Sequence, residues 1–150
     1  MGLGTRGFAM KVKIFTTGGS LDKGYSTKES AFVVGEPEIE SILREARVTF
    51  DYEVESLLRT DSLELTEQDR ELISRRVKED PVRHILITHG TDTMARTGRS
   101  LAGIEGKTIV LTGAMQPASF KQTDAHFNVG FALAALQILP PGVYLAMNGA

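Results

Sequence analysis

The 150-residue sequence contains no cysteine, which excludes disulfide bonds, thiolate metal sites and a cysteine nucleophile. Its formal net charge is only −2, with acidic and basic residues interspersed, so no surface for nucleic acid is indicated. No apolar run approaches the roughly 20 residues that a membrane helix requires. The beginning of the chain also lacks the apolar segment of a signal peptide. We therefore expect a cytoplasmic protein that binds neither nucleic acid nor membrane.

The length fits one domain with its own apolar core. Residues 1–10 are rich in glycine and only weakly apolar, and we expect them to form a flexible N-terminal tail. Residues 11–150 contain no repeat, linker or low-complexity segment. This part of the chain is therefore expected to fold as a single domain.

Short apolar runs alternate with helical periodicity along this domain. Strands are expected at residues 11–17, 48–58, 84–90, 107–115 and from 142 onward. Helices are expected at residues 35–46, 65–80, with Thr66 as the cap, 93–103 and 125–139. This alternation, with continuous apolar strands such as ILIT (85–88) and TIVLT (108–112), indicates a mainly parallel sheet covered on both faces. The sequence predicts an α/β fold: a flavodoxin-like three-layer sandwich with a mainly parallel five-stranded sheet in the order 2-1-3-4-5.

Three of the predicted strands end in threonine and glycine, in TTGGS (16–20), THGTDT (88–93) and TGAM (112–115). In open parallel sheets, ligands bind beyond the carboxyl ends of the strands, where the strand order reverses. The first and third strands are neighbours at that point, so Thr16, Thr17, Gly18 and Gly19 would face the segment 89–92. The glycines allow close approach and expose N–H groups that can line an oxyanion site. Hydroxyl groups and one carboxylate are therefore expected around a single crevice.

Each of these features also has a purely structural explanation. Threonine and glycine are common in turns and caps, and Asp92 can cap the helix that follows it. His89 is expected to be packed or hydrogen-bonded rather than a base, and Tyr25 can be a surface aromatic. TTGGS lacks the Gly-Lys-Ser/Thr ending of a phosphate loop. The joint occurrence of the motifs is therefore more informative than any one of them.

In combination, TTGGS, ITHGTDTM (87–94) and LTGAMQPASFKQTDAHFN (111–128) carry a family resemblance. The sequence resembles the N-terminal domain of bacterial-type L-asparaginases, in order, over nearly all of residues 11–150. The resemblance implies an amidohydrolase that converts L-asparagine to L-aspartate and ammonia through a threonine nucleophile and an acyl-enzyme, with L-glutamine as an alternative substrate. It implies no metal or organic cofactor. The apolar helix at 125–139 favours a homo-oligomer, with a place in the core as its alternative explanation.

The resemblance also implies catalytic roles for residues in the matched motifs. Thr17 falls at the position of the nucleophile. Tyr25 falls at the position of a tyrosine that assists the nucleophile from a mobile loop. Thr91 matches the second catalytic threonine, and Asp92 matches the carboxylate that binds the amino group of the substrate.

Further residues match positions that bind substrate. Ser62 falls where the family has a serine that holds the substrate carboxylate, and Asp61 before it resembles other members. Ala114 matches a residue whose backbone carbonyl contacts the side-chain amide. Backbone N–H groups in the turns at Thr17–Gly18 and Gly90–Thr91 are expected to stabilise the oxyanion.

Two departures from the family pattern leave alternatives open. The catalytic lysine of the family follows the fifth strand, where this sequence ends, and neither Lys23 nor Lys121 is expected to replace it. The C-terminal domain that completes the site in the usual members is also missing. We therefore keep three hypotheses: a short-chain asparaginase, which is favoured, a catalytically weak or inactive amino-acid-binding module, and a fragment whose last strand pairs with another chain.

Overall fold

The computed structural model describes residues 10–150, apart from the side chain of Tyr25. The strands within these residues are β1 (Lys11–Thr16), β2 (Lys23–Ser26), β3 (Ala31–Val34), β4 (Asp51–Ser56), β5 (His84–Thr88), β6 (Thr108–Thr112) and β7 (Gly142–Leu145). The helices are α1 (Ile39–Glu45), α2 (Glu67–Glu79), α3 (Met94–Ser100) and α4 (Ala125–Ile138). Two short 3₁₀ turns, η1 (Ser20–Asp22) and η2 (Ser62–Glu64), follow β1 and β4. None of these helices is long and apolar enough to cross a membrane.

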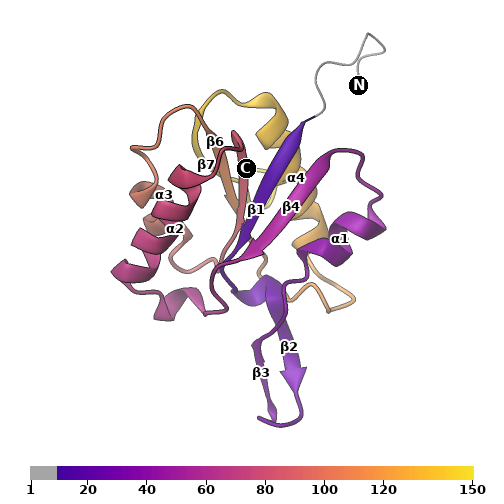
Figure 1. Cartoon of the computed structure of the whole chain (residues 1–150). Helices are drawn as coiled ribbons and strands as arrows, with labels where there is room; N and C mark the ends of the chain where they lie inside the picture. Colours follow the sequence, from indigo (N-terminus) through magenta and orange to yellow (C-terminus); the bar gives the residue numbers. More distant parts are fainter. Residues whose placement is uncertain (1–9) are drawn as a thin grey trace.

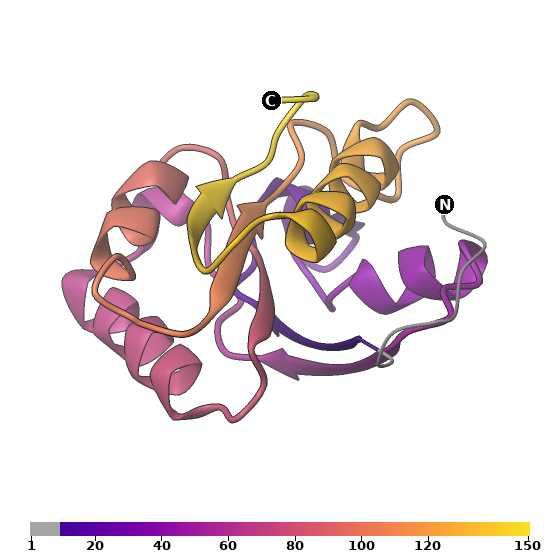
Figure 2. The same cartoon turned by 90° about the horizontal axis from the view of Figure 1, so that it is seen from above.

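The central sheet of the described residues has the strand order β4-β1-β5-β6-β7, and every neighbouring pair is parallel. This is the 2-1-3-4-5 order that the sequence predicts, so the predicted fold class is confirmed. Figures 1 and 2 show α1 and α4 on one face of the sheet and α2 and α3 on the other. The result is a sandwich of three layers.

Alternation along the strands divides the core into two layers. Ile14 of β1 and Leu86 of β5 pack with α1 and α4, whereas Phe15 of β1 and Ile87 of β5 pack with α2 and α3. All four side chains are fully buried. Because both faces are covered, the inner strands β5 and β6 are buried along nearly their whole length, which explains the continuous apolar runs ILIT and TIVLT in the sequence.

Helix α2 begins as its sequence predicts. The Thr66 hydroxyl accepts a hydrogen bond from the N–H of Asp69 at 3.1 Å, and the Asp69 carboxylate accepts one from the N–H of Thr66 at 2.9 Å. This reciprocal capping box contributes about 1 kcal/mol to the stability of the helix. It also fixes where the chain leaves η2, a turn that carries one of the candidate site residues.

The segment after β1 differs from its prediction. The segment around Tyr25, expected as a loop, contains the antiparallel hairpin β2–β3, which projects beyond the carboxyl edge of the sheet (Figure 1). Phe32 of β3 packs edge-on against Phe120, with ring centroids 5.4 Å apart. The N–H of Ala118 donates to the carbonyl of Leu21 at 3.0 Å. The hairpin is thus anchored to the loop between β6 and α4.

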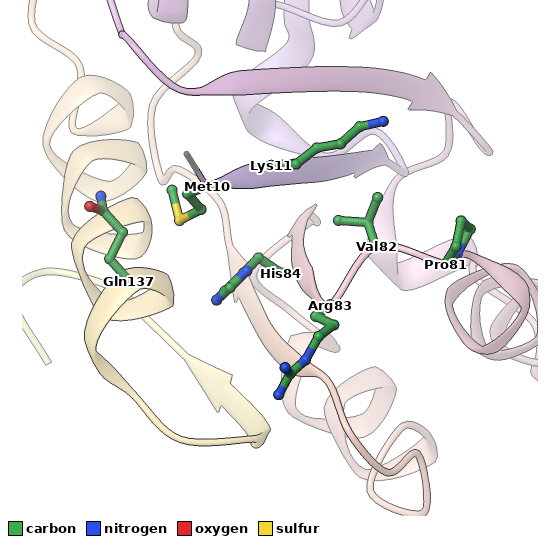
Figure 3. Close-up of a pocket in the computed structure, with 7 residues that line it drawn as sticks. All are labelled: Met10, Lys11, Pro81, Val82, Arg83, His84 and Gln137. Atoms are coloured by element: carbon green, nitrogen blue, oxygen red, sulfur yellow. The ribbon is translucent and has the colours of Figure 1, made fainter. Parts of the chain in front are cut away.

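The expected N-terminal tail lies outside the described residues except for Met10, which is partly buried against the core. Met10, Lys11, Arg83, His84 and Gln137 line part of a hollow of about 750 Å³ at the amino edge of the sheet. Figure 3 shows that the basic side chains around this hollow extend away from one another. The hollow therefore lacks a convergent set of polar groups, and the candidate site lies at the opposite edge.

Candidate active site

Three loops at the carboxyl edge of the sheet pack against one another through glycines. A Cβ added at Gly19 would lie 2.6 Å from the Cα of Gly90, and one added at Gly90 would lie 2.6 Å from the hydroxyl oxygen of Ser62. A Cβ added at Gly18 would lie 2.5 Å from the backbone nitrogen of Thr60. Gly18 and Gly19 also have φ values of 99° and 88°, which favour glycine. The loops after β1, β4 and β5 therefore pack together at one edge of the sheet, where the strand order predicts that the loops after β1 and β5 meet.

Thr17 lies at the start of the first loop and is 1 % exposed. Its hydroxyl donates to the carbonyl of Thr88 at 2.8 Å, and its N–H donates to the same oxygen at 3.1 Å. The oxygen of the Thr17 hydroxyl keeps its lone pairs free of hydrogen bonds from other described residues. The Thr17 N–H is already engaged, so the N–H groups in the two turns that make no hydrogen bond to another described residue are those of Gly18, Gly90 and Thr91.

Ser62, Thr91 and Asp92 present polar side chains that have no hydrogen-bond partner among residues 10–150. Ser62 is fully buried, Thr91 is half-buried and Asp92 is exposed. Asp92 does not cap α3, because the N-cap is Thr93, whose hydroxyl donates to the Ser62 carbonyl at 2.8 Å. This bond ties the Thr91–Asp92 turn to the turn that carries Ser62. The turn of Thr91 and Asp92, whose side chains reach the surface, is thus held against the turn of Ser62, whose unpaired hydroxyl is buried.

Asp61 connects the hairpin to the candidate site. Its carboxylate accepts from the Lys23 ammonium at 2.9 Å, and this hydrogen bond, opposed by partial burial, lowers the pKa of Asp61. Lys23 begins β2, the strand that also holds Tyr25. The ion pair therefore positions the strand of Tyr25 relative to η2, although the side chain of Tyr25 itself lies outside the described part.

Ala114 is fully buried in the loop after β6. This loop is held by Asp124, whose carboxylate accepts from the N–H groups of Met115 and Gln116 at 2.9–3.1 Å. Asn128 donates to the Gly113 carbonyl at 2.9 Å and to Asp124 at 3.0 Å. Sequence reasoning missed this anchor, although both residues lie inside the motif at 111–128. The anchor fixes the backbone around the Ala114 carbonyl.

Asp22 is a second residue that sequence reasoning missed. It is 3 % exposed and lies where the two strands of the hairpin meet the rest of the chain. Its carbonyl accepts from the N–H of Gly35 at 2.9 Å, and its carboxylate accepts from the N–H of Glu38 at 3.0 Å. Burial raises the pKa of Asp22 to about 7. The hydrogen bond from the Glu38 N–H and the charge of Arg59 oppose this rise, whereas the negative charge of Glu38 adds to it. Asp22 therefore holds the end of the hairpin through its backbone carbonyl, and the start of α1 through a carboxyl group that titrates near neutrality.

Replacing Asp22 by asparagine is expected to change how stability depends on pH. The folded protein holds a proton on Asp22 up to about pH 7, whereas the unfolded chain releases it near pH 3.8. The stabilisation from this proton is therefore complete below about pH 4 and is lost as the pH rises through about 7. Between pH 4 and pH 8 the wild type should therefore lose about 2–4 kcal/mol of unfolding free energy that Asp22→Asn does not lose. Urea denaturation of both proteins at several pH values measures this difference, and parallel pH profiles would contradict it.

No group of three or more His, Asp or Glu residues within the described part of the chain could hold a metal ion. The chemistry available at this edge is that of hydroxyls, one exposed carboxylate and backbone N–H groups. A threonine hydroxyl with free lone pairs can attack a carbonyl carbon, and N–H groups at glycine turns can stabilise the negative charge that develops.

Comparison with known proteins gives this geometry a context. Residues 11–150 match the family described as "Asparaginase, N-terminal". An L-asparaginase from Thermococcus kodakarensis is 33% identical over 147 residues, which covers 91% of this chain and 44% of that protein. A probable periplasmic L-asparaginase from Haemophilus influenzae is 28% identical over 148 residues, covering 91% of this chain and 42% of that protein.

The solved structure of the thermostable Thermococcus kodakarensis L-asparaginase superimposes with a TM-score of 0.77 at 30% identity, over 91% of this chain and 44% of that one. The chain thus spans less than half the length of the relatives it matches. The similarity nevertheless covers the whole sheet and all three loops of the candidate site. From the matched region and the shared fold, the chain belongs to the asparaginase family, whose N-terminal domain it matches.

Proposed function

We propose that the carboxyl edge of this sheet hydrolyses the side-chain amide of L-asparagine, with Thr17 as the nucleophile. The observation that carries this proposal is the packing of Gly19 on Gly90 and of Gly90 on Ser62, in a chain of the asparaginase family. This packing places the loop of Thr17 against the loop that carries Thr91 and its neighbouring carboxylate.

The unpaired side chains suit an amino acid as the substrate. The exposed carboxylate of Asp92 can pair with the α-ammonium group, and the Ser62 hydroxyl can donate to the α-carboxylate. A buried hydroxyl that has no partner is costly in the free protein, so a ligand that accepts from Ser62 relieves this cost. Asp61, already paired with Lys23, would border the same end of the substrate. Recognition of both charged groups leaves the side-chain amide to face Thr17.

The proposed reaction has two half-reactions. The Thr17 hydroxyl oxygen forms a bond to the amide carbon, the carbon–nitrogen bond breaks, and the hydroxyl proton leaves with the amine as ammonia. Water then hydrolyses the ester, which restores the threonine and releases L-aspartate. The N–H groups of Gly18 and Thr91 would stabilise the oxyanion in both steps, and the Ala114 carbonyl would hold the amide. Thr91 and Tyr25 are proposed as relays for the proton.

An ammonia-release assay with L-asparagine tests this function, and a parallel assay with L-glutamine tests the choice of substrate. Asp92→Ala should raise KM about 10–100-fold, because a charge-assisted bond to the α-ammonium group is lost. Asp51→Ala is the matched control, since Asp51 is an exposed carboxylate at the amino end of β4. Absence of ammonia release would contradict the proposal. Calorimetric binding of L-aspartate without ammonia release would instead support the amino-acid-binding module.

The homo-oligomer and the cytoplasmic location expected from the sequence are also part of this proposal. Phe127 and Ile138 on α4 are 61% and 79% exposed, which supports contact with another chain. Light scattering on the purified protein measures the oligomeric state.

For the cellular location, the name of the Haemophilus influenzae relative assigns that protein to the periplasm and not to the cytoplasm.

A further inference from the structure

Behind the Gly90–Thr91 turn, three buried polar side chains form a chain of hydrogen bonds. They are Arg70 on α2, Thr97 on α3 and His89 at the end of β5, and each is at most 2 % exposed. The Nε of Arg70 lies 3.2 Å from the hydroxyl of Thr97, and that hydroxyl lies 2.7 Å from Nε2 of His89. Nδ1 of His89 lies 2.7 Å from the carbonyl oxygen of Gly90. As the sequence predicts, His89 is packed and hydrogen-bonded.

The partners of each group fix the direction of these hydrogen bonds. A carbonyl oxygen only accepts, so Nδ1 of His89 carries the proton and donates to Gly90. In the neutral ring Nε2 then accepts from the Thr97 hydroxyl, whose oxygen accepts from the guanidinium of Arg70. Burial, together with the charge of Arg70, lowers the pKa of His89 and favours this neutral form. Every donor in the chain therefore has one acceptor.

Arg70 is itself held firmly. Its other donors reach the carbonyl of Leu65 at 3.2 Å and the carboxylate of Glu67 at 3.0 Å, one turn before it on the same helix. The guanidinium therefore meets Thr97 from a fixed position rather than as a mobile charge. Because Arg70 is buried behind the site, it is placed to act through other residues and not on a substrate.

The last hydrogen bond of the chain orients a peptide plane. In a trans peptide the carbonyl of Gly90 and the N–H of Thr91 point in opposite directions. Holding the Gly90 carbonyl against His89 therefore directs the Thr91 N–H away from the ring. This N–H remains available for an oxyanion, since it makes no hydrogen bond to residues 10–150.

We propose that Arg70, Thr97 and His89 are positioning residues that lock the Gly90–Thr91 peptide plane and thereby aim the Thr91 N–H at the oxyanion. This inference rests on the proposed amidohydrolase function for its catalytic consequence. The orientation of the peptide plane does not depend on that function and can be measured without substrate.

The kinetic test compares Thr97→Val, which keeps the shape and removes the hydroxyl, with Thr97→Ser, which keeps the hydroxyl. With L-asparagine, Thr97→Val should lower kcat about 10–100-fold, because a small misplacement of a catalytic donor has effects of this size. KM should change by less than about threefold, since none of the three residues contacts the substrate, and Thr97→Ser should recover most of kcat. A kcat of Thr97→Val within twofold of the wild type would overturn the proposal.

A second measurement uses nuclear magnetic resonance on the free protein. The chain has three histidines, so the ring nitrogens of His89 can be assigned with a His89→Asn variant. The wild type and Thr97→Ser should show the neutral Nδ1–H ring and one sharp Thr91 amide signal, and Thr97→Val should shift or broaden that signal. A wild-type ring protonated on Nε2, or a Thr91 amide unchanged in Thr97→Val, would overturn the proposal.

These two measurements separate the failure of the inference from the failure of the proposed function. If the wild type releases no ammonia, the amidohydrolase proposal fails, and the ring and amide signals alone decide whether the peptide plane is locked. If Thr97→Val does not fold, Arg70→Met takes its place. That variant removes the distal donor, leaves the bond from Thr97 to His89 intact, and should show a smaller change of the same kind. An Arg70→Met variant whose kcat and Thr91 amide signal equal those of the wild type would overturn the proposal.

Discussion

Replacing Thr17 by alanine is expected to lower ammonia release from L-asparagine by at least about 10³-fold, because the reaction then lacks its nucleophile. The fold should survive this change. The Thr88 carbonyl that accepts from the Thr17 hydroxyl also accepts from the Thr17 N–H at 3.1 Å, so it keeps one hydrogen bond. Circular dichroism and urea denaturation check the fold, and initial rates of ammonia release measure the effect.

Thr17→Ser is the matched control for this prediction. Serine keeps the hydroxyl that attacks the amide carbon and loses only a methyl group, so substantial activity should remain. Equal rates for Thr17→Ala and the wild type would show that the ammonia comes from another residue or from a contaminating enzyme.

Gly19→Ala is expected to have the largest effect on stability, about 2–4 kcal/mol. Alanine at this position would place a Cβ 2.6 Å from the backbone of Gly90, and it would have to adopt a φ of 88°. Backbone atoms on both sides of the contact cannot rotate out of the way, so the loops after β1 and β5 must separate. The same change should therefore also abolish amidase activity. The midpoint of urea unfolding measures the loss of stability.

Gly130→Ala provides the control for the glycine effect. Gly130 is exposed on α4, and an added Cβ there meets nothing within 4 Å. Alanine is the better helix former, so this variant should be more stable than the wild type by about 0.5–1 kcal/mol. An unfolding midpoint of Gly19→Ala equal to that of the wild type would contradict the close packing of the two loops.

The sequence predicted the sheet and the meeting of the loops because both depend on patterns that are local in the chain. Continuous apolar runs mark strands buried on both faces, and their order follows from the rules for parallel βαβ units. The threonines and glycines at 16–19 and 88–91 then fall at the carboxyl ends of two neighbouring strands. This part of the candidate site required no information beyond the strand order.

The hairpin could not be predicted in the same way. Each of its strands has four residues, and β2 combines Lys23, Gly24 and Ser26 with a single aromatic residue, so no alternation marks it. It forms through pairing with β3 and through contact of Phe32 with Phe120, which is distant in sequence. Such contacts leave no periodic signal in either segment.

The buried polar residues are only partly visible in the sequence. Arg70 lies three and seven residues before Ile73 and Val77, on the apolar face of α2, and a charged residue at such a position signals a buried partner. Asp22 offers no comparable signal, because it belongs to a turn whose partners at Gly35 and Glu38 depend on the path of the hairpin. Its burial follows from the tertiary structure alone.

The central claim is that Thr17 forms a covalent ester with the substrate, and peptide mass mapping tests it most directly. The protein is mixed with L-asparagine, quenched in acid within the first turnovers, digested and analysed for an added aspartyl group. We predict that the wild type carries this group on Thr17 and that Thr17→Ala carries none. An aspartyl group on another residue, or ammonia release without any acylated peptide, would contradict the account.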